Sequence, residues 1–424
     1  MDIIQELLQN VPLPRMVKIR QRFAAAAVAD IAGAVAAEMA RPGTGERVRP
    51  GARIAITVGS RGIADIAAIT RSTVAEVRRR GGEPFVVPAM GSHGGATAAG
   101  QAEVLAGLGV TEESVGCPIV SSMEVVALGK LESGLTVFID RQAAEADGII
   151  VLNRVKPHTA FRGPSESGLV KMLTIGLGKQ KGADSCHAYG FGHMARHIVD
   201  MAGIVLAKAP VLFGLAIVEN ADEKVAKIAG VPAEAIIETD RRLLTEAKAN
   251  MPRIPFDKMD VLIVDRIGKE FSGDGMDPNI TGRYSTPFAS GGPEVNKIVV
   301  LDLTAATHGN ANGIGVADFT TRRLVDKINY HYTYANAFTS TITVPARLPL
   351  IMDTECDAVR AAIKTCNARD LSWPRLVRIS DTLHLNELSI SEALLAEAGA
   401  AANITVLGEP QPMAFSPAGD LLDC

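Results

Sequence analysis

Apolar residues in the first part of the chain alternate between short continuous runs and longer helical periodicities. Short runs rich in β-branched residues occupy 53–58, 84–88, 148–152 and 211–218, mostly beside glycine or proline. Helical periodicity covers 23–39, 66–80, 97–108, 167–174, 188–206 and 232–248, where Pro232 suits a first helical turn. Strands that alternate with helices predict an α/β domain whose sheet is mainly parallel.

The alternation breaks at Asn250-Met251-Pro252 and then starts again. A chain of 424 residues also exceeds the roughly 250–300 residues that one hydrophobic core holds. We therefore expect two α/β domains with mainly parallel sheets, at 1–253 and 254–424, and a ligand site in the cleft between them. In the second domain we expect strands at 260–265, 297–303, 375–379 and 404–407, a helix at 318–328 and a β-rich segment at 340–351.

Composition narrows the class of function. A net charge of −4 gives no basic surface for nucleic acid, and no apolar run approaches the ~20 residues that span a bilayer. The first ten residues include acidic ones where a secretory signal is basic, so we expect a cytoplasmic protein that binds neither nucleic acid nor membranes. The five cysteines contain no Cys-x-x-Cys pair, which argues against a disulfide framework or a cysteine zinc site.

Three predicted strand ends carry residues that suit ligand chemistry. The first strand is followed by Gly59-Ser60-Arg61-Gly62, the second by Gly91-Ser92-His93-Gly94-Gly95, and the third by Lys156-Pro157-His158. Glycine lets a ligand approach the backbone, arginine can bind phosphate, and two histidines on opposite sides of a substrate carbon can transfer protons. The alternative is tight turns with a solvated arginine and an incidental histidine.

The segment from Asn153 to His187 is dense in histidine, lysine and glycine. Lys171 follows an apolar stretch, where a lysine is either desolvated and reactive or extends to water. His193 and His197 are spaced to share a helix face and could bind a metal, although two solvated helix histidines are the favoured reading. Lys179 and Lys181 receive no role from the pattern.

Two polar loops are expected in the second domain, at Lys269–Tyr284 and Thr307–Gly313. Their length and their content of Gly, Asp, Asn and Arg favour ligand contacts from a second domain. Long surface turns are the alternative.

The order and spacing of Arg61, His93, His158, Lys171 and His187 resemble those of the nickel-dependent lactate racemase family. These α-hydroxy-acid racemases and epimerases have two α/β domains and use a nickel-pincer nucleotide. The resemblance implies that Lys171 holds this nucleotide covalently through a thioamide and that His187 completes the nickel coordination. It implies that His93 and His158 are the catalytic histidines and that Arg61 contacts the phosphate, with Ser60 and Gly91 beside the cofactor.

The reaction that the resemblance implies is a hydride shuttle, in which one histidine takes the hydroxyl proton and the carbon-bound hydrogen leaves as hydride. Return of the hydride to the other face of the planar keto acid inverts the centre. The expected partners are a small 2-hydroxy acid and the enzymes that make the cofactor. The oligomeric state stays open.

The chain also departs from the family pattern. Val58-Gly59-Ser60-Arg61-Gly62 stands where the family has Asp-x-Thr-Arg-Pro, and Gly94 follows His93 where lactate racemases have arginine. We therefore expect a divergent member acting on another hydroxy acid, such as a sugar acid. A nicotinamide-linked oxidoreductase of the same fold and a non-catalytic ligand-binding homologue are the alternatives. The substrate-binding candidates are Arg162, Asn279 and Arg283, with Asp277 beside them.

Overall fold

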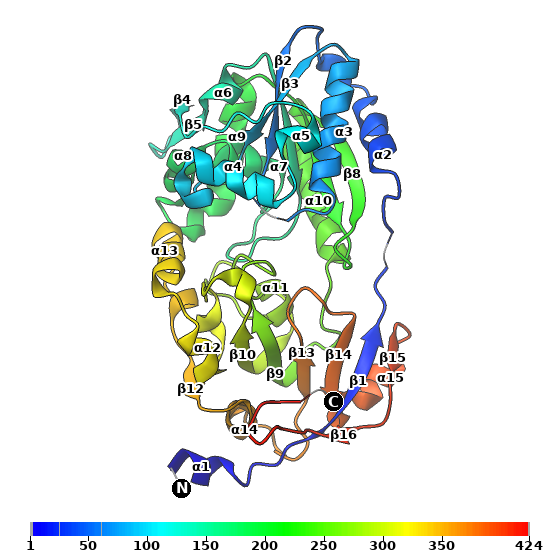
Figure 1. The fold of residues 1–424 in the computed structure, drawn as a ribbon, viewed down its shortest axis with the longest axis vertical. Coiled ribbons are helices and arrows are strands. Elements are labelled where there is room, and N and C mark those ends of the chain that lie inside the picture. The colour runs from blue at the N-terminus through cyan, green and yellow to red at the C-terminus, as the bar shows by residue number, and fades with distance from the viewer. Residues whose placement is uncertain (1–2, 25, 61, 423–424) are drawn as a thin grey trace. The chain divides into compact units, whose positions relative to one another are not determined.

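Two compact units make up the molecule, which we describe from a computed structural model at residues 3–24, 26–60 and 62–422 (Figure 1). The central unit is Ala24–Met251, and the split unit is Met1–Phe23 together with Pro252–Cys424. The structure thus divides the chain differently from the predicted ranges 1–253 and 254–424. Residues 1–23 belong with the C-terminal part because β1 (Arg15–Gln21) pairs with strands of that part, at Met16 with Ser391 and at Ile19 with Val406.

The central unit is built on a five-stranded sheet in the order β3-β2-β6-β7-β8. Its first four strands are parallel and β8 is antiparallel to β7, so β2, β3 and β6 end at the same edge. Buried aliphatic side chains on these strands and on α3 form its core. The strand bounds are β2 Arg53–Val58, β3 Glu83–Pro88, β6 Gly148–Arg154, β7 Val211–Glu219 and β8 Val225–Pro232.

Helices and one hairpin complete the central unit. The first long helix starts at Ile31 instead of residue 23, because the Asp30 side chain caps it by accepting the N–H of Gly33. The helices are α2 Ile31–Met39, α3 Ile66–Arg79, α4 Ala98–Gly107, α5 Glu112–Val115, α6 Arg141–Ala144, α7 Leu169–Lys171, α8 Lys179–His187, α9 Phe191–Lys208 and α10 Ile236–Asn250. Shorter elements are η1 Gly45–Arg47, η2 Gly94–Ala96, the π-helical turn η3 Met172–Gly176, η4 Ala233–Ala235 and the hairpin β4 Val125–Lys130 with β5 Thr136–Asp140.

The split unit contains the larger sheet, in the order β12-β11-β10-β9-β13-β14-β1-β15, with β16 pairing to β1. Strands β9 to β13 are parallel, whereas β14, β1 and β15 run antiparallel to their neighbours. The strands are β9 Lys258–Ile267, β10 Glu294–Leu303, β11 Phe319–Thr321, β12 Leu350–Met352, β13 Leu376–Ile379, β14 Glu387–Ser391, β15 Ile404–Val406 and β16 Gln411–Pro412. The helices are α1 Ile3–Leu8, α11 Pro278–Thr281, α12 Arg322–Asp326, α13 Tyr330–Ser340, α14 Glu355–Thr365 and α15 Leu395–Ala400, with short turns η5 Ala305–Thr307, η6 Ile314–Val316, η7 Val344–Ala346 and η8 Glu392–Leu394.

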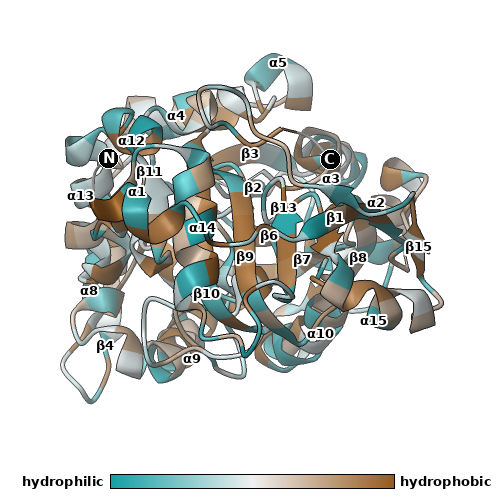
Figure 2. Cartoon of the chain, turned by 90° about the horizontal axis from the view of Figure 1, so that it is seen from below, coloured by the Kyte–Doolittle hydropathy of each residue, from teal (hydrophilic) through white to brown (hydrophobic). Residues whose placement is uncertain are grey.

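These two sheets confirm the predicted class of two α/β units with mainly parallel strands. Buried strands such as β7 and β9 are hydrophobic over most of their length (Figure 2). No helix in the described residues is long and apolar enough to cross a membrane. The ligand cleft between the units stays a prediction.

Two local predictions in the split unit were wrong. The expected helix at 318–328 is the short strand β11 followed by α12, and the expected β-rich segment at 340–351 contributes only β12 to the sheet. Between them lies α13, whose N-cap Asn329 accepts the N–H of Tyr332. The tyrosines of α13 are exposed. Tyrosine favours strands when its side chain packs against a sheet, and these exposed side chains lack that packing.

Candidate functional site

The segment after β6 folds into a compact series of turns at the carboxyl edge of the central sheet. It passes through α7, the π-helical turn η3 and α8, and it therefore carries His158, Lys171 and His187. The π-turn begins directly after Lys171, and π-turns inside helices are frequent at functional sites. Sequence periodicity predicted one helix here and could not show the interruption.

A buried carboxylate stabilises the start of α7, the first of these three turns. Asp240 on α10 accepts the N–H of Leu169 at 2.8 Å, and a Cβ at Gly168 would lie 2.1 Å from the same carboxylate. Burial raises the pKa of Asp240 to about 6. Residue 168 must therefore be glycine if α7, and Lys171 with it, is to begin against α10.

His158 is held by contacts on both its backbone and its ring. Its N–H donates to Glu166 at 2.8 Å, and its carbonyl accepts from Arg162 at 2.7 Å. The ring Nδ1 accepts the N–H of Ala160 at 3.1 Å, so the neutral imidazole carries its proton on Nε2. His158 is thus presented as a hydrogen-bond donor, and it must release Ala160 before Nε2 can accept a proton.

Glu166 organises the loop around His158. It is almost fully buried, and besides the N–H of His158 it accepts Lys248 Nζ at 2.7 Å and the Arg162 guanidinium at 3.3 Å. Arg162, predicted as a substrate contact, therefore stabilises the loop that carries His158. No sequence pattern predicted the contact between Glu166 and Lys248.

Phe191 at the start of α9 brings His158 and His187 together. The ring centroids are 6.0 Å apart for His158 and Phe191 and 5.5 Å apart for His187 and Phe191, while Phe161 lies 4.5 Å from His158. Burial, followed by the positive charge of Lys171, holds the pKa of His158 well below its usual range. Burial and Lys171 also lower the pKa of His187, so both imidazoles are neutral near pH 7.

The resting state of His187 suits a metal ligand. Its Nδ1 donates to the carbonyl of Ala183 at 2.7 Å, which leaves the Nε2 lone pair available. Within residues 3–24, 26–60 and 62–422, no group of three or more His, Cys, Asp or Glu side chains could hold a metal ion.

His93 lies on the loop after β3, beside the loop after β2. Its Nδ1 is hydrogen-bonded to the hydroxyl of Ser60, so the two predicted residues are brought together. Gly91 has φ +61°, and a Cβ there would lie 3.1 Å from the side chain of Ile175 in η3. Both glycine loops therefore approach the segment that carries Lys171. Arg61, the predicted phosphate contact, lies outside the described residues.

The second-domain candidates lie on loops of the split unit. Asn279 donates its backbone N–H and its side-chain amide to Asp277, which caps α11. The Arg283 guanidinium binds Asp318 and donates to the carbonyls of Val295 and Asn296 at 2.9 and 2.8 Å. These contacts give Arg283 a structural role, and its substrate role stays a prediction.

The same unit holds a histidine that the sequence analysis did not select. Nδ1 of His384 lies 3.0 Å from both oxygens of the buried Asp381, and His384, Lys18 and Arg378 line a pocket of about 510 Å³. His193 and His197, the possible metal pair, are stacked on α9 with centroids 5.6 Å apart. In the part of the chain that the structure describes, no ring contact joins them to Phe191, which contacts His158 and His187.

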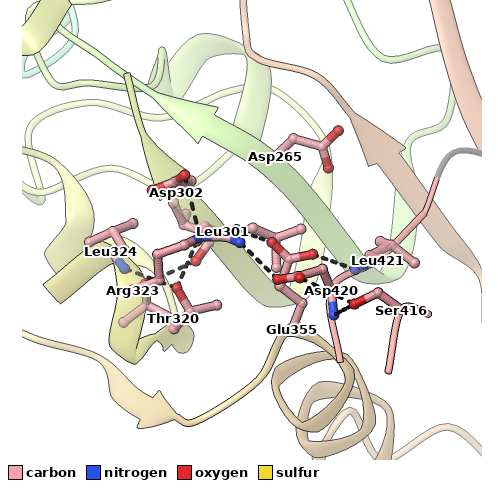
Figure 3. Close-up of polar contacts among 12 residues, drawn as sticks. Asp265, Leu301, Asp302, Thr320, Arg323, Leu324, Glu355, Ser416, Asp420 and Leu421 are labelled. Carbon is pink, nitrogen blue, oxygen red and sulfur yellow. Dashed lines mark hydrogen bonds and ion pairs between the residues drawn. The ribbon is translucent and has the colours of Figure 1, made fainter. Parts of the chain in front are cut away.

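An ion-pair cluster fixes the C-terminal segment to the split unit (Figure 3). Arg323 on α12 pairs with Asp302, Glu355 and Asp420, and Glu355 also accepts the N–H of Leu421 at 2.6 Å. Each acidic group shares the same guanidinium. The cluster therefore has a structural explanation and needs no ligand.

Comparisons with known proteins find a similar domain and a similar fold. Residues 9–197 match the family described as the lactate racemase N-terminal domain, and the match includes His93, His158, Lys171 and His187. The solved lactate racemase apoprotein from Thermoanaerobacterium thermosaccharolyticum has a similar fold, with a TM-score of 0.52 and 13% identity over 87% of this chain and 98% of that chain. No curated protein matches the chain. The resemblance seen in the sequence is thereby confirmed, and residues 9–197 are similar to the N-terminal domain of lactate racemases.

Proposed function

We propose that the chain is a racemase or epimerase of a 2-hydroxy acid, working with a nickel-pincer nucleotide. The observation that carries this proposal is the packing of neutral His158 and His187 on Phe191, under the charge of Lys171. These residues would serve as a base, a metal ligand and an amine for cofactor attachment, and all of them lie within residues 9–197, which match the family model.

The residues divide into those that hold the cofactor and those that act on the substrate. Lys171 would bind the nucleotide covalently and His187 would supply nitrogen to nickel, with Ser60, Gly91 and Arg61 beside the nucleotide. When bound, this cofactor supplies an acceptor for hydride from the substrate carbon. The protein then has to orient the hydroxy acid and move the hydroxyl proton.

His93 is the better placed base at the start of the reaction. If its Nδ1–H donates to Ser60, its Nε2 carries the lone pair that would take the hydroxyl proton. His158 begins as an Nε2–H donor, which can hold the substrate oxygen. Inversion from the other face requires His158 to give up its bond from Ala160, so the two histidines start in unequal states.

Covalent attachment provides the most direct test. The protein is co-expressed with enzymes that make the cofactor, and intact mass and nickel content are measured for the parent, Lys171→Ala and Lys181→Ala. We expect an adduct and nickel in the parent and in Lys181→Ala, whose exposed lysine lies on the neighbouring α8, and neither in Lys171→Ala. An unmodified, nickel-free chain that inverts hydroxy acids would overturn the proposal.

Substrate choice needs a separate assay. Loaded protein is incubated in deuterium oxide with a panel of lactate, tartrate and sugar-acid stereoisomers, and inversion is followed by chiral separation. Gly94 stands where lactate racemases have arginine, and this departure leads us to expect larger hydroxy acids to be inverted faster than lactate. Binding without inversion of any member would favour a non-catalytic role.

A further inference from the structure

The loop that carries His93 has little conformational preference of its own. Gly91, Gly94 and Gly95 all have positive φ, at +61°, +66° and +63°, and His93 itself is exposed. Glycine-rich backbone populates many conformations when nothing restrains it. The direction of the His93 ring must therefore be set by contacts from outside the loop.

Ser60 contacts the ring itself, and Gln101 holds the backbone of the loop from within α4. Its side chain is fully buried, and its Nε2 donates to the carbonyls of Gly91 and His93 at 2.9 and 3.2 Å. The two carbonyls flank Ser92, so one amide group holds the loop on both sides of its turn.

A buried lysine fixes which way this amide points. Lys179 Nζ donates to Gln101 Oε1 at 3.0 Å and to the carbonyl of Pro88, at the end of β3. An ammonium only donates and a carbonyl only accepts, so the oxygen of Gln101 must face Lys179 and its NH₂ must face the loop. The orientation is thus determined by chemistry on both sides.

Asp140 keeps the lysine in place. Its Oδ2 lies 3.2 Å from Lys179 Nζ, both side chains are fully buried, and Asp140 Oδ1 caps α6 through the N–H of Ala143. Replacing a buried ion pair with apolar residues often leaves stability unchanged or improves it, so stability alone is weak grounds for its presence. Its geometric effect is to aim Gln101 at the His93 loop.

We propose that Gln101, oriented by the buried Lys179–Asp140 pair, is the positioning residue for His93. This inference rests on the proposed role of His93 and adds a group that acts on the reaction only through it. No step of the proposed chemistry uses Lys179 directly.

The test compares Gln101→Glu, Gln101→Leu and a control, Ser121→Ala, in the full chain. Glu keeps the volume and the acceptor for Lys179 but removes the NH₂, whereas Leu removes both. The Ser121 hydroxyl donates at 2.7 Å to the carbonyl of Ala98, which lies on α4 as Gln101 does. Loss of this hydroxyl therefore perturbs α4 without touching the loop. The readouts are amide hydrogen exchange over 91–97 and the ring ¹⁵N signals of His93, His158 and His187.

We expect both Gln101 variants to speed exchange in the loop by roughly tenfold and to change the His93 ring signals. Ser121→Ala, and the signals of His158 and His187, should stay as in the parent. An unchanged loop, or equal changes at all three histidines, would overturn the inference. Neither readout needs cofactor or substrate, so the two proposals can fail separately. If the His93 signals shift in the Gln101 variants but His93→Ala is fully active, Gln101 still positions His93 while the proposed function is rejected.

In loaded enzyme, the Gln101 variants should lower kcat more than they raise KM, because the base is misplaced while substrate contacts remain. Gln101→Asn, which retains an amide on a shorter side chain, should recover part of the loss. A change in KM alone would point to substrate binding and overturn the assignment.

Discussion

The carboxyl edges of the two sheets both carry histidines, lysines and arginines, but in different electrical settings. In the central unit, His158 and His187 are neutral and lie in the field of Lys171. In the split unit, Arg323 faces three carboxylates and His384 faces a buried aspartate. Charges that are balanced within the protein can be explained by structure alone, whereas shifted pKa values such as those of His158 and His187 are frequent at functional sites.

The largest effect should come from removing the histidines of the central unit. His158→Ala and His93→Ala are each expected to reduce kcat/KM by roughly 10² to 10⁴-fold, the usual contribution of a general acid or base. His384→Ala, at the other edge, should retain activity. The measurement is inversion of the best substrate by loaded enzyme, and equal losses in all three variants would break the contrast between the edges.

The pH dependence of stability tests the burial of Asp240. Its pKa is about 6 in the folded chain against 3.8 as the ordinary value, so the folded state binds the proton more tightly and this group destabilises the fold as pH rises from 4 to 6. Asp240→Asn should remove up to roughly 3 kcal/mol from the change in unfolding free energy over this pH range, since one pKa unit corresponds to about 1.36 kcal/mol.

Urea unfolding of parent and Asp240→Asn between pH 4 and 7 gives this difference. The Asn oxygen can still accept the N–H of Leu169, so the helix anchor is retained. Parallel pH profiles of the two proteins would show that Asp240 titrates as an ordinary carboxyl.

Gly168→Ala probes how tightly the central edge is packed. The added Cβ would lie 2.1 Å from the Asp240 carboxylate, so α7 must shift, at an expected cost of about 1–3 kcal/mol in unfolding free energy. Gly203→Ala is the matched control, because Gly203 lies in α9 with nothing within 4 Å of its Cβ position. There alanine should stabilise by roughly 0.5–1 kcal/mol. Equal effects at both glycines would contradict the close packing.

The smallest effect is expected at the split edge. Arg283→Lys loses the planar fork that binds Asp318 and two backbone carbonyls, and it should destabilise by about 1–2 kcal/mol. Arg20→Lys, at an exposed pair with Glu387, should cost less than about 1 kcal/mol. If Arg283→Lys raises KM and leaves stability unchanged, Arg283 binds substrate and the split edge is part of the site.

Much of the central sheet could be predicted from the sequence, because β2, β3, β6 and β7 are continuous buried runs and sit where their periodicity ends. The strands β1 and β8 carry exposed residues between buried ones and were not predicted. Short elements such as β11 depend on tertiary pairing with β10, which local pattern does not contain.

The candidate site shows the same division. Histidines and lysines near strand ends were visible because glycines surround them in the sequence. The sequence could not single out Gln101, Glu166 and Phe191 as site residues, since each is placed there by a contact with a residue on another element. Lys179 and Asp140 are distant in sequence, and only the fold shows that they form one buried pair.

Strand β1 also has a consequence for how the chain is made. Its residues Met16, Val17 and Ile19 are buried only when β14 and β15 are present, and Met16 pairs with Ser391. At 5–20 residues per second, synthesis leaves this apolar segment without its partners for roughly 20 to 75 seconds. The central unit, whose residues all emerge in one continuous stretch, can fold during that interval, while the split unit must wait until β14 and β15 have been made.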